Sequence, residues 1–433
     1  MRKTPTSLDQ ATFDALISGV LRYKCWAYLM LAKIYGEAVW IDDPLIEYQD
    51  ISKYPTLGFK EVIGNCINLI EKGIVITDFR GEEHVISGKM RVRWTEILNN
   101  TDLVWNRYCP PAEALLTELY LFDEQYDNAI QSGFAMLRIG AEDSQTKPSF
   151  QITKTEWKGE WLSLFGSFTR TEAIFIIQYD YDQKQTNHLM EYFSNDPANK
   201  YYLKPTQVTI DRYKNETGDD GSAGDKYRGF SNDGVNGKTV KMENGEWVVW
   251  KYTAARSSAD KIYRNDAPIT LYRAPDIHLW LAEALVYKGR LEEAVVAFYD
   301  GGIESYYDKE SGMFTGKFSD FPATLYSSSS DGSCMGIRGR AGLLKKGGDI
   351  IKNPSANIED DQRKIINLLI EETCMESAGE ARALYAMLRA AKRWNDPSFV
   401  ADKVSAKYPD GKKQEMKNKL QNSENWFIKY NLK

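Results

Sequence analysis

The sequence predicts a mainly α-helical protein in which paired helices frame a loop-rich region with short strands. Long segments keep apolar residues at helical spacing, and two of these segments repeat one pattern at an offset of 165 residues. Between the two copies, residues 144–270 are rich in Gly, Asn, Asp and Ser. At 433 residues with 42% hydrophobic content, the chain is long enough to bury a large core.

The first helices are predicted from apolar periodicity and from their stop signals. Residues 8–37 form one amphipathic segment that stops near Gly36, and residues 57–73 form another that ends at Gly73. A third helix is expected after Pro110-Pro111, because proline suits the first helical turn. We expect this helix over residues 112–125 and a further helix from Tyr126 onwards.

The segment "LYRAPDIHLWLAEALVYKGRLEEAV" at 271–295 repeats the pattern of the segment that begins at Pro110. Each copy places a proline before a long apolar helix, then a short turn, then a small alanine in a second helix. The matched positions are Pro110 and Pro275, Leu116 and Leu281, Tyr126 and Leu291, Ala129 and Ala294. Small residues at such positions let two helices approach closely, which is typical of tetratricopeptide-like pairs. We therefore expect residues 8–143 and 271–300 to form a tetratricopeptide-like helical frame.

The rest of the chain is divided into regions by amino-acid composition. Residues 144–270 are expected to form a loop-rich, ligand-side region with strands near 172–181 and 246–254. Residues 301–358 form an insertion whose aromatic content argues against disorder, and residues 359–433 form a C-terminal helical block. In the block, Glu372, Glu376 and Glu380 recur every four residues, and Arg382, Arg389 and Arg393 follow at spacings of seven and four. The favoured interpretation is that these charges form ion pairs that tie the helix to the frame.

Composition excludes several classes of function. A net charge of −6 argues against a nucleic-acid binder, which would carry a basic domain or stripe. The five cysteines lie far apart without a CxxC pair, and three histidines add little, so neither a metal site nor a cofactor is expected. No constellation of acid, base and nucleophile appears, so the protein is not expected to be an enzyme. The longest apolar runs are too short for a transmembrane helix.

Segments in a fixed order along the chain resemble the SusD/RagB family of outer-membrane nutrient-binding lipoproteins. The first half carries "LRYKCWAYLMLAKIYGEAVWIDDPL", "WNRYCPPAEALLTELYLFDEQYDNAI" and "WLSLFGSFTRTEAIFIIQYDY". The second half carries "ITLYRAPDIHLWLAEALVYKGRLEEAV", "GIRGRAGL" and "EETCMESAGEARALYAMLRAAKRW". The chain departs from the family in lacking the lipidated N-terminal cysteine and the aspartate expected after the arginine of the last segment.

The resemblance implies a single SusD-like domain over residues 1–433 that binds glycans without catalysis. It further implies a SusC-like TonB-dependent transporter as partner and a place on the extracellular face of the outer membrane. Attachment would be through an N-terminal lipid anchor that this sequence does not contain. The alternative is a helical-repeat scaffold that binds a protein or a peptide, with the aromatic loops packed on it.

Candidate ligand-binding residues come from aromatic loops, because sugar rings stack on aromatic side chains while polar neighbours bond to their hydroxyl groups. The region 225–252 and the region 301–326 both offer this combination. The predicted contact residues are Asp225, Tyr227, Arg228, Trp247, Tyr306, Tyr307 and Phe314. Trp250 is instead expected in a strand core, because the run "WVVWKY" alternates.

Overall fold

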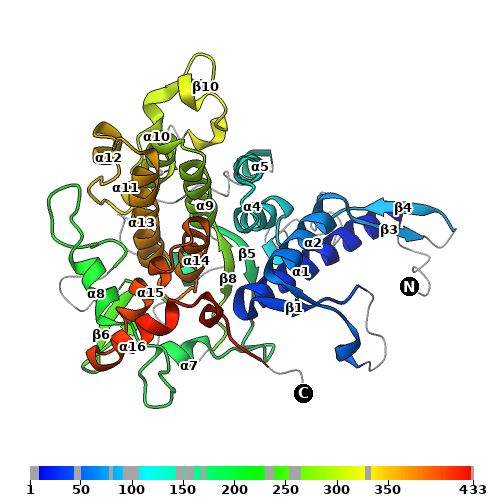
Figure 1. Cartoon of the computed structure of the whole chain (residues 1–433), viewed down its shortest axis with the longest axis horizontal. Coiled ribbons are helices and arrows are strands. Elements are labelled where there is room, and N and C mark those ends of the chain that lie inside the picture. The colour runs from blue at the N-terminus through cyan, green and yellow to red at the C-terminus, as the bar shows by residue number, and fades with distance from the viewer. Residues whose placement is uncertain are drawn as a thin grey trace.

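The computed structural model describes residues 9–42, 50–77, 81–90, 107–142, 152, 160–166, 172–229, 238–252, 265–326 and 333–430. Its largest feature is a series of packed helices that crosses the molecule from the N-terminal side to the C-terminal block (Figure 1). The main helices are α1 (Gln10–Tyr35), α2 (Phe59–Glu71), α4 (Ala112–Phe122), α5 (Tyr126–Glu142), α9 (Ala274–Tyr287), α10 (Leu291–Ala294), α13 (Ile358–Glu376) and α14 (Ala383–Trp394).

Helices that follow one another in the chain pack as pairs, and the pairs pack in chain order. The pairs are α1 with α2, α4 with α5, α9 with α10, and α13 with α14. Helix α2 then contacts α4, α5 contacts α9, and α9 contacts α13, so one continuous core runs through the series. Every residue of α9 is buried, which makes this helix the centre of the array.

The predicted repeat agrees with the helix starts. Helices α5 and α10 begin at Tyr126 and Leu291, the two positions matched by the offset, and Ala129 and Ala294 are both buried. The second copy is shorter, since α10 continues only as the π-helical turn Val295–Tyr299. Helix α9 starts as predicted from proline in its first turn, and Asp276 accepts a hydrogen bond from the Arg273 backbone at 2.7 Å.

Two predicted helices are interrupted in the structure. The segment 112–125 ends as a helix at Phe122, because Glu124 takes a left-handed φ of 60° before α5 begins. The C-terminal block breaks between α13 and α14, where Gly379 and Ala381 have φ values of 80° and 58°. Helix α1 ends as expected, with Gly36 in the left-handed region.

The strands form short antiparallel pairs. Strand β5 (Ala173–Ile177) pairs with β8 (Ile269–Arg273), which leads directly into α9. The other pairs are β1 (Glu37–Val39) with β2 (Thr56–Gly58), β3 (Ile74–Thr77) with β4 (Glu83–Ile86), β6 (Val240–Glu243) with β7 (Glu246–Val249), and β9 (Tyr307–Asp308) with β10 (Met313–Phe314). The two strands predicted in 144–270 are therefore present as β5 and β7, each shorter than its sequence run.

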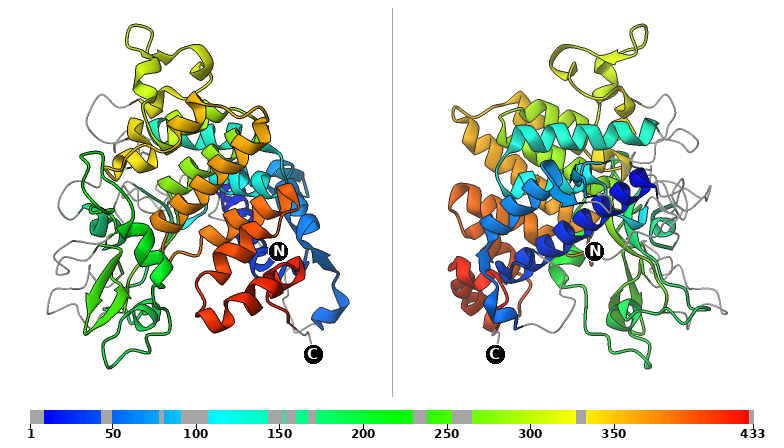
Figure 2. Two further views of the ribbon diagram at one scale, coloured as in Figure 1. Left: turned by 60° about the vertical axis from the view of Figure 1, so that its left-hand side comes forward. Right: turned by 90° about the vertical axis from the view of Figure 1, so that its right-hand side faces the viewer.

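Shorter helices complete the fold around the main array. They are α6 (Glu160–Gly166), α7 (Leu189–Phe193), α8 (Gln207–Lys214), α11 (Gly336–Arg340), α12 (Gly348–Lys352), α15 (Ser398–Ser405) and α16 (Asp410–Leu420). Both views of Figure 2 place the β9–β10 hairpin at one end of the molecule and the β6–β7 hairpin at the other. Cys25, Cys66 and Cys374 are buried, as expected of small hydrophobic residues.

Candidate functional site

The seven predicted contact residues fall into two groups that are far apart. Asp225, Tyr227, Arg228 and Trp247 lie on or beside the β6–β7 hairpin, whereas Tyr306, Tyr307 and Phe314 lie at the β9–β10 hairpin. Figures 1 and 2 place these hairpins at opposite ends of the molecule. The two groups therefore do not form one binding surface.

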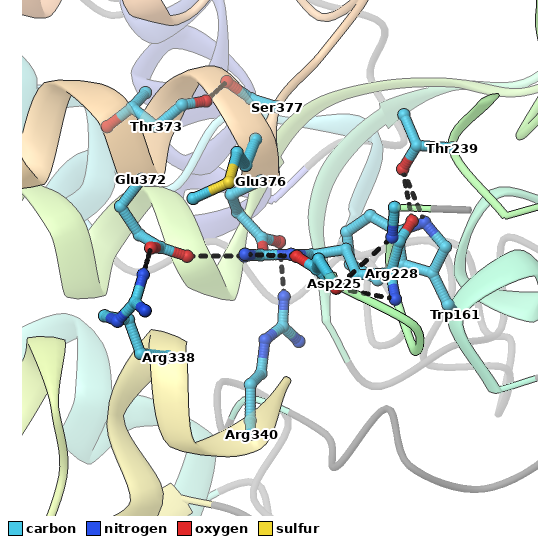
Figure 3. A network of polar contacts seen from close by, with 12 residues as sticks. Trp161, Asp225, Arg228, Thr239, Arg338, Arg340, Glu372, Thr373, Glu376 and Ser377 are labelled. Carbon is cyan, nitrogen blue, oxygen red and sulfur yellow. Dashed lines mark hydrogen bonds and ion pairs between the residues drawn. The ribbon is translucent and has the colours of Figure 1, made fainter. Parts of the chain in front are cut away.

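Asp225 and Arg228 are not available to a ligand, because both are completely buried. Figure 3 shows the Arg228 guanidinium among three carboxylates from two segments, the loop of Asp225 and helix α13. The distances are 2.8 Å to Asp225, 2.6 Å to Glu372 and 2.9 Å to Glu376. A buried charge is costly unless it is paired and hydrogen-bonded, and here three carboxylates of the protein surround the guanidinium. The prediction that these two residues contact a ligand is wrong, since their charges belong to the core.

This pair is part of a larger buried ionic cluster centred on Glu376 at the end of α13. The Glu376 carboxylate accepts hydrogen bonds from Arg228, Arg273 and Arg340, and its side chain is 1% exposed. Burial alone would raise the pKa of Glu376, but the three guanidinium charges outweigh it and hold the pKa well below its usual range. The carboxylate therefore stays ionised in the folded protein.

Neighbouring carboxylates extend the cluster to other elements. Glu372 accepts hydrogen bonds from Arg338 and Arg228, and Glu380 accepts from Arg273 and Lys251. Burial opposes the ionisation of Glu380, yet Arg273 and Lys251 lower its pKa to about 2. The prediction of ion pairs to the frame is confirmed for Glu376 and Glu380, which both pair with Arg273. Glu372 instead pairs with Arg228 and Arg338, which lie outside the frame.

The arginines of the C-terminal block also pair as expected. Arg382 lies 3.2 Å from Asp276, and Arg389 forms two hydrogen bonds to Glu283, at 2.8 and 2.7 Å. Both acids are on α9, so these contacts join α14 to the central helix. Arg338 and Arg340 come from the segment "GIRGRAGL", and Glu372 and Glu376 from the last of the resembling segments. These two segments therefore meet inside the protein through buried ion pairs.

Tyr227 is half-buried and holds a loop in place. Its ring lies against Gly342, where a Cβ would come within 2.7 Å of the ring, and Gly342 has a φ of 62°. The Asp219 backbone donates to the Gly342 carbonyl and the Leu344 backbone donates to the Thr217 carbonyl, both at 2.9 Å. Tyr227 thus packs at the junction of two backbone segments.

Trp247 is half-buried on β7. Its ring packs against a small core of Ile210, Tyr213, Val240 and Met375. Trp250 lies after the end of β7, half-buried, with the Lys241 ammonium 3.9 Å from its ring. The prediction of Trp250 in a strand core is wrong, because the strand ends at Val249 and buries Val248 and Val249 instead.

The aromatic residues of the 301–326 loop mostly pack on one another. Phe314 is 3% exposed, so the prediction that it contacts a ligand is wrong. Tyr307 stacks on Tyr326 at 3.8 Å, and the Tyr306 hydroxyl donates to Glu292 at 3.0 Å. Tyr306 and Tyr307 remain half-buried, with part of each side chain accessible.

The most exposed aromatic surface beside Trp247 is one that the sequence patterns did not single out. We call Tyr192, Tyr201 and Tyr202 the tyrosine face. Tyr202 is 68% exposed and Tyr192 is 36% exposed, with their rings 6.0 Å apart and tilted by 34°. The only sequence signal is the run "KYYLKP" between two polar stretches, which contains Tyr201 and Tyr202. No periodic pattern marks Tyr192 or Tyr202.

The β6–β7 hairpin holds the tyrosine face in position. The Tyr201 hydroxyl donates to the Trp247 carbonyl, and the Asn195 amide donates to the Glu243 carbonyl at 2.6 Å. Lys204 adds an ion pair with Glu246 at 3.0 Å. Tyr201 has a left-handed φ of 49°, which a non-glycine residue adopts at some cost and which these contacts fix. The exposed Lys200 and Asp196 provide polar groups in the same loop.

Among the residues that the structure describes, no group of three or more His, Cys, Asp or Glu side chains is arranged to hold a metal ion. The same residues contain no helix long and apolar enough to cross a bilayer. Phe230 and Asn232, which also lie in the predicted 225–252 region, fall outside the described residues.

Comparison with solved structures identifies the fold. A SusD superfamily protein from Bacteroides vulgatus superposes with a TM-score of 0.53 at 13% identity, over 97% of this chain and 75% of that one. A SusD-like carbohydrate-binding protein from Bacteroides fragilis gives 0.54 at 10% identity, over 91% and 70%. A SusD-like carbohydrate-binding protein from Bacteroides vulgatus gives 0.53 at 16% identity, over 89% and 64%. No protein-family model and no curated protein matches the chain. The predicted fold class, a mainly α SusD-like fold, is confirmed.

Proposed function

We propose that this chain, which has a SusD-like fold, binds glycans at the cell surface without catalysis and delivers them to a TonB-dependent outer-membrane transporter. The observation that carries the proposal is the fold match over most of the chain to proteins described as SusD-like and carbohydrate-binding. Because fold alone does not fix function, the proposal also needs a surface with suitable chemistry.

The tyrosine face has that chemistry. Sugar rings present apolar C–H faces, which stack on exposed aromatic rings, and their hydroxyl groups bond to charged and amide side chains. Tyr192 and Tyr202 supply the exposed rings, and Asp196 and Lys200 supply acceptor and donor groups in the same loop. The Trp247 backbone carbonyl accepts the hydrogen bond of the Tyr201 hydroxyl, so Trp247 is kept in the proposed site.

Tyr227, Tyr306 and Tyr307 are retained as secondary contacts of the proposal, since each keeps part of its side chain accessible. In the proposed division of the chain, residues 8–143 and 271–300 act as frame and 144–270 as the ligand-side region. Residues 301–358 form an aromatic insertion, and 359–433 form the C-terminal block. All belong to one domain, 1–433.

The alternative of a scaffold for a protein or peptide is favoured by one feature of α1. Val20, Leu31 and Ile34 are 60%, 39% and 38% exposed on this helix, although they are apolar. An exposed apolar stripe on a helix is typical of a surface that binds another protein. The same stripe would also suit the proposed transporter partner.

A glycan array followed by calorimetry tests the proposed function. Binding of a polysaccharide or oligosaccharide is expected, and it should weaken when Tyr192 and Tyr202 are replaced by alanine. No binding to any glycan, together with tight binding of peptides, would favour the scaffold. The gene's upstream sequence and neighbours test the location: a leader with a lipobox cysteine beside a transporter gene is expected for the surface protein.

A further inference from the structure

A second concave surface lies at the far end of the helical frame from β9–β10. It is a groove of about 630 Å³ between the C-terminal end of α1, the start of α2, the α4–α5 turn, α14 and residues 421–429. This volume is within the range of about 300–1,000 Å³ that is usual for ligand pockets. We call it the tail groove, and it shares no lining residue with the tyrosine face.

Six aromatic side chains line the tail groove, four of them half-buried and two, Phe122 and Tyr126, buried. They are Tyr35, Phe59, Phe122, Tyr126, Trp426 and Phe427. They come from four helices and the C-terminal segment, so residues distant in sequence converge on one space. Such convergence of aromatic rings around a concave surface is typical of a binding site.

The C-terminal segment is fixed as one wall of the groove. The Ile428 backbone donates to the Ile34 carbonyl at 2.9 Å, and the rings of Tyr35 and Tyr430 lie 5.0 Å apart. The Phe427 ring lies directly against Gly36, where a Cβ would be only 2.9 Å away. The same glycine that ends α1 therefore gives Phe427 its place in the wall.

Charged groups of both signs line the groove beside these rings. Lys60, Lys392 and Lys429 contribute ammonium groups, and within the described part of the chain none of them has a carboxylate partner within ion-pair distance. Glu37 and Glu424 contribute carboxylates, and among the described residues neither has a cationic partner within ion-pair distance. Asn395 and Gln421 add amides, which both donate and accept hydrogen bonds.

The mixture of charges limits the class of ligand. An anion would be repelled by the carboxylates of Glu37 and Glu424, and a cation by the three lysine ammonium groups. A neutral ligand with many hydroxyl groups avoids both penalties, because each hydroxyl donates to a carboxylate or accepts from an ammonium group. A ligand with apolar faces in addition would stack on the aromatic walls.

We propose that the tail groove is a separate binding site for a neutral oligosaccharide. This proposal rests on the proposed function, since it assigns a second site to the same class of ligand. Two sites on one chain would let a long polysaccharide bind with higher avidity than either site alone provides.

Calorimetry with neutral hexasaccharides tests the proposal. The probes are an α-1,4-glucan, a β-1,4-mannan and a β-1,4-xylan, titrated at high concentration into the complete chain. Two sites per chain are expected for at least one probe. Replacing Lys60 and Lys392 together by alanine should weaken one site about tenfold or more and leave the other unchanged, because two hydrogen bonds are lost. The matched control is Lys53→Ala with Lys413→Ala, two exposed lysines outside the groove.

The outcomes separate the two proposals. Phe59→Ala is a second groove variant, and its circular dichroism and melting temperature show whether it is folded. If the groove variants lose one site while Tyr202→Ala leaves that site intact, the groove proposal is supported. If the groove variants bind every probe as the wild type does while Tyr202→Ala loses binding, the groove proposal is overturned and the proposed function stands. If no probe binds the wild type, or if only apolar peptides compete for the groove, the groove proposal is overturned.

Discussion

Removing the charge of Glu376 should destabilise the protein more than removing any exposed acid. The Glu376 side chain is only 1% exposed and lies among Arg228, Arg273 and Arg340. Glu376→Gln keeps the size and an oxygen acceptor, but it replaces the negative charge that faces these arginines with a neutral amide. Breaking a buried ion pair by removing one partner costs about 3–5 kcal/mol. Each guanidinium keeps another carboxylate, Glu372 for Arg228, Glu380 for Arg273 and Glu172 for Arg340, so we expect a loss in the lower part of that range.

Urea unfolding at pH 7 measures this loss directly. Domains are usually stable by only about 5–15 kcal/mol, so the variant should unfold at a much lower urea concentration than the wild type. The matched control is Glu415→Gln on the exposed face of α16, which should change the free energy of unfolding by no more than about 0.5 kcal/mol. A Glu376→Gln variant within about 1 kcal/mol of the wild type would refute the reasoning, because the cluster would then contribute no more than surface charges do.

Three further predictions follow from the same structure. The pKa of Glu380 is about 2 in the folded protein, against an ordinary value of 4.5. Its ionisation therefore contributes on the order of 3 kcal/mol to the free energy of unfolding above pH about 4.5, and this contribution is lost as the pH falls towards 2. A profile of stability against pH without a decline in that window would contradict the prediction. Trp247→Ala should lower the free energy of unfolding by about 2 kcal/mol, because its half-buried ring packs on a small core, and an unchanged melting temperature would show that the ring does not support that core. Gly36→Val should lower the melting temperature, because the residue has a φ of 78° and a side chain would meet Phe427; the control Gly411→Val, in open space, should melt closer to the wild type.

The frame was predictable from sequence because it follows from periodicity. The helix starts at Tyr126 and Leu291 appear as a repeated pattern, and the charges of Glu376 and Arg389 appear at helical spacing. Helical spacing depends on local geometry alone, so a single sequence carries it. The break between α13 and α14 was missed because Ala381 adopts a left-handed φ that alanine rarely takes.

The candidate site was predictable only in part, because it depends on which loop residues become exposed. Asp225 and Arg228 have the composition of ligand contacts, but Glu372 and Glu376, almost 150 positions away, pair with Arg228 and bury it. Tyr202 is exposed because its loop is fixed on the β6–β7 hairpin through Tyr201. Pairing at this sequence separation leaves no periodic trace.

Titration of a neutral oligosaccharide into the wild type and into the Tyr192→Ala, Tyr202→Ala double variant tests the central claim most directly. Both residues are exposed, so the double variant should keep the wild-type melting temperature. Glycan binding to the wild type is expected, and loss of two stacking contacts should weaken the tyrosine-face site by about tenfold or more. Wild-type affinity in the double variant at every site, or no glycan binding by the wild type, would contradict the account.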